Sequence, residues 1–171
     1  MQTTRRTPIS GNRRGLFFAV ASSILVIDQL SKVWAVARLE DADPIVIIDG
    51  FFSLNFVRNP GAAFSFAEGF TFVIAIIALV VCGYLIRLSG KVSNLPWTIA
   101  LSLVFTGAMG NLLDRIFREP GVMRGHVVDF LQLTFINFPI FNVADIAITF
   151  GAILIVLLSW LGIDIDGEAD E

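Results

Sequence analysis

Long apolar runs alternate with short polar segments along this chain of 171 residues. The apolar runs cover about residues 15–37, 64–88, 96–117 and 139–161. An α-helix needs about 20 apolar residues to cross a bilayer, so each run is long enough to span it. We therefore predict four membrane-spanning helices. The first is expected to be retained, because no Ala-x-Ala cleavage site follows it.

The polar segment between the first two runs has a different pattern. Within residues 44–57, the β-rich stretches Ile45–Ile48 and Phe51–Val57 flank Asp49-Gly50. Asp-Gly is a favoured two-residue hairpin turn. The pattern predicts a small β element at the outer surface of the membrane. Residues 118–138, which are rich in turn residues, are expected to form a loop.

The two ends of the chain are polar. Residues 1–14 carry four arginines and residues 164–171 are acidic. We predict a cytoplasmic tail at the first and a disordered tail at the second. Four spans place both termini on one side of the membrane. The positive-inside rule decides little here, since the other side carries Arg38, Arg58, Arg115, Arg118 and Arg124. We expect the termini in the cytoplasm because the first span usually dominates the orientation. The whole chain is predicted to be a single all-α membrane domain with a small extracytoplasmic β element.

Composition supports an integral membrane protein. Hydrophobic residues make up 56% of the chain and charged residues only 16%, with a mean hydropathy of +0.79. A soluble domain of this size cannot bury that much apolar surface. The net charge of -3 argues against a nucleic-acid partner. Cys82 and His126 are the only residues of their types, which excludes an internal disulfide and a multi-histidine metal site. We also expect no metal or other cofactor.

Polar residues from different spans fall at one depth. A helix rises about 1.5 Å per residue, which places Asp28 about 20 Å from the inner end of the first span. The third span also runs outward and the fourth runs inward. The residues that reach this level are Asp28, Lys32, Asn59, Asn111, Asp114, Arg115, Asp129, Asn142 and Asp145. Such agreement predicts a site near the extracytoplasmic face.

Several of these residues also have structural interpretations. Asp28 and Lys32 are spaced i,i+4 on one helix face and are interpreted mainly as an ion pair that orients the first span. Asp114 and Arg115 are interpreted as a structural pair at a helix end, with substrate contact an equal alternative for Arg115. Gly107-x-x-Gly110 is more typical of close helix packing than of catalysis.

Asp129 and Asp145 are the candidate catalytic residues. A charge inside an apolar span costs roughly 2.5–3.5 kcal/mol at the bilayer centre, so Asp145 needs a partner or water. Two adjacent carboxyls share a proton, and one can then activate water while the other donates a proton, as in aspartic proteases. The neutral Asn59, Asn111 and Asn142 are expected to hold a peptide backbone or the developing oxyanion without neutralising the pair.

Two other classes of function remain open at this point. The same carboxylates suit a proton- or cation-coupled transporter. Against this, the chain has no visible internal repeat, and its polar residues stop at one depth. The third class is an assembly protein whose polar cluster is only structural. Neither a Gly-x-Ser-x-Gly nor a His-Glu-x-x-His motif is present to indicate serine or zinc chemistry.

Five motifs resemble the lipoprotein signal peptidase (signal peptidase II) family, in the family's order. They are Asp28-Gln-Leu-Ser-Lys32, Arg58-Asn-Pro-Gly-Ala-Ala-Phe-Ser65, Gly107-Ala-Met-Gly-Asn-Leu-Leu-Asp-Arg115, Val127-Val-Asp-Phe130 and Phe138-Pro-Ile-Phe-Asn-Val-Ala-Asp145. Each motif alone is weak, but together they are highly specific and reach from the first span to the fourth.

The resemblance implies a four-helix aspartyl endopeptidase of the bacterial cytoplasmic (inner) membrane. The family removes the signal peptide of prolipoproteins, cutting before a cysteine that carries diacylglycerol. By the motif match, Asp129 and Asp145 take the catalytic positions, and the other polar residues surround them. The resemblance also implies membrane lipids and globomycin-type inhibitors as partners, and we expect a monomer. Residues 116–126 look longer than is usual in the family, and Thr106 stands where the family often has Gly.

Overall fold

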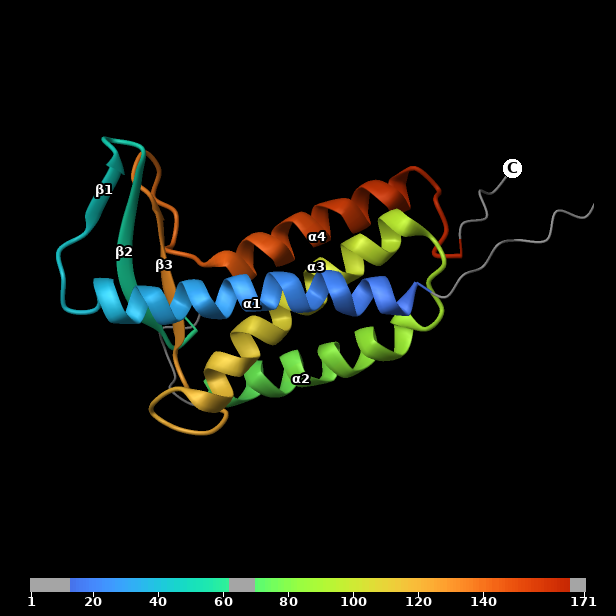
Figure 1. Ribbon diagram of the computed structural model, residues 1–171, viewed down its shortest axis with the longest axis horizontal. Helices are drawn as coiled ribbons and strands as arrows, with labels where there is room; N and C mark the ends of the chain where they lie inside the picture. Colours follow the sequence, from blue (N-terminus) through green and yellow to red (C-terminus); the bar gives the residue numbers. More distant parts are fainter. Residues whose placement is uncertain (1–12, 62–69, 167–171) are drawn as a thin grey trace, which may run out of the picture.

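The computed structural model describes residues 13–61 and 70–166. These residues form four helices and a small sheet, as predicted (Figure 1). The helices are α1 (Arg14–Leu39), α2 (Phe70–Ser89), α3 (Leu95–Phe117) and α4 (Val143–Trp160), and the strands are β1 (Ile45–Ile48), β2 (Phe52–Asn59) and β3 (Val127–Leu133). All four helices are long and apolar enough to cross a membrane. Most of both predicted tails, and the predicted start of the second span at residue 64, lie outside the described residues.

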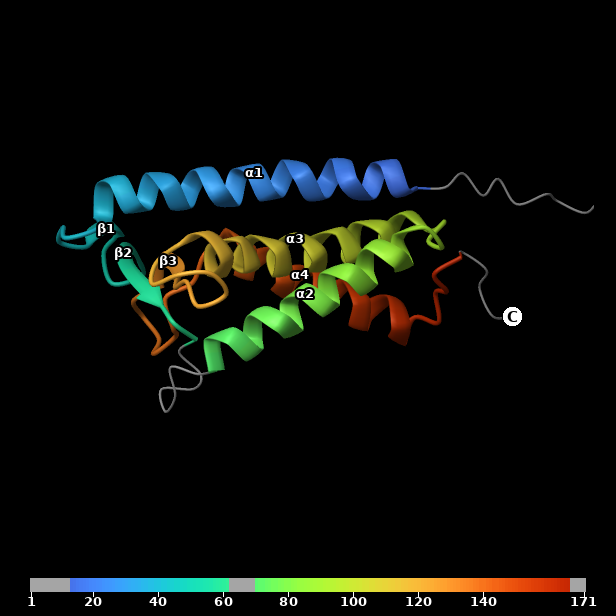
Figure 2. The ribbon, with the colours of Figure 1, turned by 90° about the horizontal axis from the view of Figure 1, so that it is seen from below.

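Helix α3 is the centre of the bundle. It packs against each of the other three helices, whereas α2 packs mainly against α3. In Figure 2, α1 lies on one side of α3 and α2 lies on the other. Over the most apolar window of each span, 56% of α3 is buried but only 22% of each other helix. This position explains why α3 is the least apolar span, since protein rather than lipid covers most of its surface.

Glycines allow α3 and α4 to approach closely. A Cβ on Gly107 would overlap the carbonyl oxygen of Ala144, and a Cβ on Gly151 would lie 2.9 Å from that of Ala100. A Cβ on Gly110 would meet the carboxylate of Asp28. The expected packing role of Gly107 and Gly110 is confirmed, because small residues at such crossings let helix backbones touch.

We expect Gly107→Ala to destabilise the bundle by about 1–3 kcal/mol, because the added methyl group meets backbone that cannot move aside. Gly83→Ala on α2 is a matched control, since a Cβ there has open space. That control should be neutral or slightly stabilising, as Ala favours helix by about 1 kcal/mol over Gly. Thermal unfolding in detergent measures both variants. Equal midpoints for the two would contradict the packing role.

The sheet contains one strand more than the sequence predicted. Strands β1 and β2 form the expected hairpin, with Gly50 at a φ of 67° in the turn. The expectation of a loop over residues 118–138 was wrong for its second half, because Val127–Leu133 forms β3. This strand pairs antiparallel with β2, so the sheet order is β1-β2-β3. Asp129 therefore lies on a strand and not in a loop.

The fourth helix starts later than its apolar run. We predicted a span from residue 139, but α4 begins at Val143. Phe141 forms a β-bridge with Leu131, with backbone hydrogen bonds in both directions, so the residues before α4 are extended. Asn142 consequently becomes the N-cap of α4. The start of α4 is thereby attached to β3, the strand that carries Asp129.

Candidate active site

Asp129 is held by two asparagine amides. Asn59 on β2 is its diagonal neighbour across the strand pair, because Asn59 lies opposite Val127 and Val57 lies opposite Asp129. The Nδ2 of Asn59 donates to Asp129 Oδ2 at 2.7 Å. The Nδ2 of Asn142 donates to Oδ1 at 2.6 Å. Asp129 is only 2% exposed, so both of its oxygens are bound by neutral donors inside the protein.

Asp145 lies in the first turn of α4. Its Oδ2 accepts the backbone N–H of Asn142 at 3.1 Å, while the side chain of Asn142 accepts the N–H of Asp145 at 3.0 Å. This reciprocal arrangement is a capping box, and the positive end of the helix dipole favours an anion there. Asp145 Oδ1 accepts from Asn111 Nδ2 at 2.8 Å. The carboxylate is therefore stabilised although it lies at the start of an apolar span.

Two asparagines connect the carboxylates. The Nδ2 of Asn142, which donates to Asp129, also lies 3.1 Å from Asn111 Oδ1. Asn111 in turn donates to Asp145. In this structure these amides bind the carboxylates themselves, and their expected role in holding a peptide backbone or the developing oxyanion stays a prediction. No ion pair from lysine or arginine to Asp129 or Asp145 occurs among the described residues.

A cavity of about 650 Å³ opens onto both carboxylates, a volume typical of small-ligand sites. Its polar lining is Asn59, Arg115, Asp129, Asp145 and Thr149, and its apolar lining comprises Gly61, Ile74, Leu133, Phe138, Pro139, Ile140, Phe141, Ile146 and Phe150. The apolar lining includes Ile74 of α2 and the exposed Ile146 and Phe150 of α4. The cavity thus combines a polar, acidic end with apolar walls that include side chains exposed on the outside of the bundle.

Asp114 and Arg115 point in different directions, so the expected pairing between them was wrong. Successive residues on a helix are rotated by about 100°. Arg115 lines the cavity, and its Nη1 donates to the carbonyl oxygen of Asn111 at 3.0 Å. Its Nε is buried without a hydrogen-bond partner among the described residues. Asp114 instead faces α1 and contacts Lys32.

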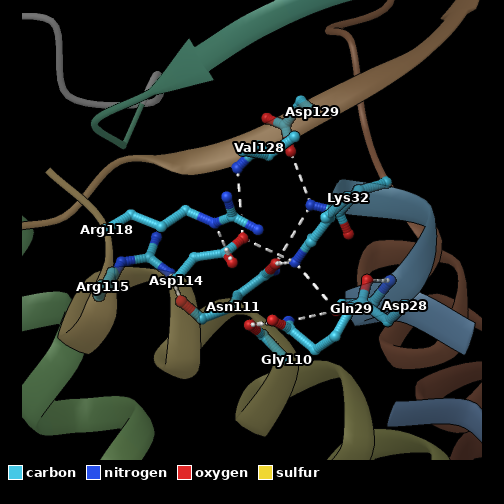
Figure 3. A network of polar contacts seen from close by, with 12 residues as sticks. Asp28, Gln29, Lys32, Gly110, Asn111, Asp114, Arg115, Arg118, Val128 and Asp129 are labelled. Carbon is cyan, nitrogen blue, oxygen red and sulfur yellow. Dashed lines mark hydrogen bonds and ion pairs between the residues drawn. The ribbon is translucent and has the colours of Figure 1, made fainter. Parts of the chain in front are cut away.

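Figure 3 shows the second group of carboxylates, around Lys32. The expected ion pair between Lys32 Nζ and Asp28 is present at 3.0 Å, and Lys32 also contacts Asp114 Oδ2 at 2.9 Å and Asn111 Oδ1 at 3.0 Å. All three charged side chains are fully buried. Asp28 Oδ1 accepts the backbone N–H of Ala144 at 2.9 Å. This cluster therefore joins α1, α3 and α4 directly behind Asn111.

The pKa of Asp129 is raised from its ordinary 3.8 to about 6. Burial is the main cause, because it disfavours the charged form. The hydrogen bond from Asn59 acts in the opposite direction, and the negative charge of Asp145 adds to the rise. Asp129 is therefore placed to exchange a proton close to neutral pH.

We expect Asp129 to titrate near pH 6 by NMR of aspartate-labelled protein. Because its folded pKa lies above the unfolded value, it stabilises the fold fully below pH about 4 and loses that contribution as the pH rises through about 6. Asn59→Leu should raise the pKa further, since it removes a bond that lowers it. Asn55→Leu is the control, because Asn55 donates to Gln132 instead. A lower pKa for Asp129 in Asn59→Leu would refute this account.

The comparisons with known proteins agree on one family. Residues 20–161 match the sequence model of signal peptidase (SPase) II. A lipoprotein signal peptidase of Streptomyces coelicolor is 49% identical over 158 residues, which are 92% of this chain and 76% of that protein. A lipoprotein signal peptidase of Rhodococcus jostii is 45% identical over 160 residues, which are 94% of this chain and 80% of that protein.

The fold has a solved counterpart as well. A bacterial membrane enzyme determined by the in meso method at 1.9 Å resolution superposes with a TM-score of 0.75 at 32% identity. The match covers 85% of this chain and 92% of that one. The sequence matches and the structural match each cover most of the chain. The chain belongs to the signal peptidase II family and is a membrane protease.

Proposed function

We propose that this protein removes the signal peptide of diacylglyceryl-modified prolipoproteins, cutting before the lipidated cysteine, with Asp129 and Asp145 as the catalytic pair. The main observation is the contrast between two kinds of carboxylate. Asp28 and Asp114 form ion pairs with Lys32, whereas Asp129 and Asp145 are bound by amides and open onto the cavity. Among the described residues no contacting cation holds Asp129 in its charged form, and burial raises the pKa of Asp129 to about 6.

The proposed reaction is direct hydrolysis. One carboxylate takes a proton from a water molecule as its oxygen attacks the scissile carbonyl carbon, and the other, protonated, donates to the carbonyl oxygen. When the tetrahedral intermediate collapses, the C–N bond breaks and the amine leaves with a proton from the pair. No side chain forms an acyl intermediate.

The lipid-facing walls of the cavity support entry from within the bilayer. Ile74 of α2 and Phe150 of α4 both line the cavity, and α2 packs mainly against α3, which leaves the side between α2 and α4 available to a signal peptide. The acyl chains would remain against the apolar walls. Arg115, whose Nε is buried without a partner among the described residues, is suited to donate to a substrate carbonyl oxygen.

The same proposal includes an orientation and a state of assembly. We place the site at the extracytoplasmic face and both termini in the cytoplasm. Arg13, Arg14, Arg87 and Lys91 lie at the helix ends opposite the sheet. Because Arg38, Arg58, Arg115, Arg118 and Arg124 lie toward the sheet, the orientation rests on the first span, which usually dominates. We further propose that the protein acts as a monomer and that globomycin-type inhibitors occupy the cavity. The transporter alternative finds no support among the relatives.

Incubation of the purified protein with a diacylated precursor and with its unlipidated twin tests this function. We expect cleavage of the first only, immediately before the lipidated cysteine, and inhibition by globomycin. Mass spectrometry of both products locates the cut. Cleavage of both precursors at similar rates would overturn the lipid requirement. Absence of cleavage of either precursor would overturn the proposed activity.

A further inference from the structure

Arg118 is attached to Asp114 at two points. It is the first residue after α3, and its backbone N–H donates to the carbonyl oxygen of Asp114 at 2.9 Å. Its side-chain Nε donates to Asp114 Oδ1 at 2.6 Å. The side chain of Arg118 is 19% exposed and that of Asp114 is fully buried. Figure 3 shows the guanidinium of Arg118 against the carboxylate of Asp114 at this helix end.

The other oxygen of Asp114 contacts the strand that carries Asp129. Asp114 Oδ2 accepts the backbone N–H of Val128 at 3.2 Å. Strand β3 is at the edge of the sheet, so this N–H faces away from β2 and requires another acceptor. Val128 directly precedes Asp129. The carboxylate of Asp114 therefore fixes the backbone of β3 one residue before Asp129.

Charge balance explains why Asp114 requires Arg118. Lys32 contacts the carboxylates of both Asp28 and Asp114, so one buried cation serves two buried anions. Arg118 is the second cation of this cluster. Without it, the cluster has an excess negative charge, which is costly inside a protein. Lys32 would then be the stronger attraction for Asp114 Oδ2, and a shift of the carboxylate toward Lys32 weakens its bond to the N–H of Val128.

We propose that Arg118 is a positioning residue for Asp129, acting through Asp114 and the N–H of Val128. This inference rests on the proposed function, because it concerns the placement of a catalytic carboxylate. Arg118 lies in the segment that looks longer than is usual in the family. Among the described residues, Arg118 is not part of the cavity lining, and its side-chain hydrogen bond goes to Asp114 and not to the proposed catalytic pair. Its effect should therefore appear in the rate of the chemical step and not in substrate binding.

Arg118→Met keeps most of the side-chain stem but removes the charge and the donors. We expect it to lower kcat on a diacylated precursor roughly tenfold, with KM changed less than twofold. Arg118→Lys should restore most of kcat, since acid and base at i,i+4 still form an ion pair. Arg124→Met, at an exposed residue of the same segment, is the matched control and should resemble wild type. Rates are expressed per folded protein.

Amide hydrogen exchange gives a readout that does not depend on activity. The N–H of Val128 should exchange roughly tenfold faster in Arg118→Met than in wild type, and Arg118→Lys should reverse this. If Arg118→Met does not fold, Arg118→Gln, which retains a donor but no charge, replaces it. If Arg118→Met, or Arg118→Gln in its place, has the kcat of wild type and the same Val128 exchange rate, this inference is overturned and the proposed function is not. Activity retained in Asp129→Asn would instead overturn the proposed function.

Discussion

Asp129→Asn and Asp145→Asn are each expected to reduce turnover of a diacylated precursor roughly a thousandfold or more. Removing one member of a catalytic unit removes nearly all of the catalysis that the unit provides. An amide can neither accept the proton of the attacking water nor donate one to the leaving amine. The substitution preserves size, so substrate binding should change little. The measurement is single-turnover cleavage, with precursor binding determined separately.

The two variants should also remain folded. Asp129 has only amide donors and no ion pair among the described residues, so a neutral amide in its place leaves no buried cation without a partner. Asp145 serves as the acceptor in the capping box of α4, and the side-chain oxygen of an asparagine can replace it there. Asp43→Asn, at an exposed residue before β1, is the control for the loss of one negative charge. Near-normal turnover in either catalytic-site variant would rule out direct hydrolysis by this pair.

The sequence predicted the helices well because each has to be apolar over about 20 residues to lie in lipid. Depth along those helices also predicted which polar residues come together. The hairpin around Asp49-Gly50 was recognisable from its turn residues and β-rich flanks. These features are local, or they follow from a one-dimensional count of residues across the bilayer.

The third strand was not predicted because its signal is weak and its partner is distant. Val127–Leu133 contains β-branched and aromatic residues, which favour a strand. The turn residues before it, among them Pro120 and Gly121, favour a loop. Pairing with β2, which lies far earlier in the chain, determines that these residues form a strand. A strand that adds to an existing hairpin is determined by that distant surface more than by its own sequence.

The sequence also did not show that the side chains of Asp114 and Arg115 point to different faces of α3. Opposite charges next to each other in sequence suggest a pair, but a helix turns them to different faces. The partners of Asp114 are Lys32 of α1 and Arg118, which is one helical turn further on. The spacing rule that correctly paired Asp28 with Lys32 would have found Arg118. Which face of α3 meets α1, and which meets the cavity, depends on the packing of the whole bundle.

The structure separates its carboxylates by the charge of their partners. Asp28 and Asp114 contact Lys32, and Arg118 adds a second cation at Asp114. A cation in contact with a carboxylate favours its charged form. Asp129 and Asp145 contact only amides and backbone N–H groups among the described residues. Asn111 lies between the two groups, since it accepts from Lys32 and donates to Asp145. The ion-paired cluster is therefore the rigid support on which the amide-held pair is placed.

Lys32→Met should cost about 3–5 kcal/mol of stability, because it leaves two carboxylates buried without their shared cation. We expect loss of folded protein together with loss of activity, measured by thermal unfolding in detergent and by cleavage of the diacylated precursor. Lys91→Met is the matched control, since Lys91 is exposed near the opposite end of the bundle. Its unfolding midpoint and activity should equal those of wild type.

A double variant separates the charge from the packing. Adding Asp28→Asn to Lys32→Met removes one of the uncompensated anions, while Arg118 remains to pair with Asp114. The double variant should therefore be more stable than Lys32→Met, with a coupling of about 1–3 kcal/mol between the two sites. Additive effects would contradict an ion-pair cluster. A Lys32→Met protein that is fully folded but inactive would show instead that Lys32 acts on the substrate or on the pair, because loss of a residue that only stabilises the fold reduces the amount of folded protein and not the activity of each folded molecule.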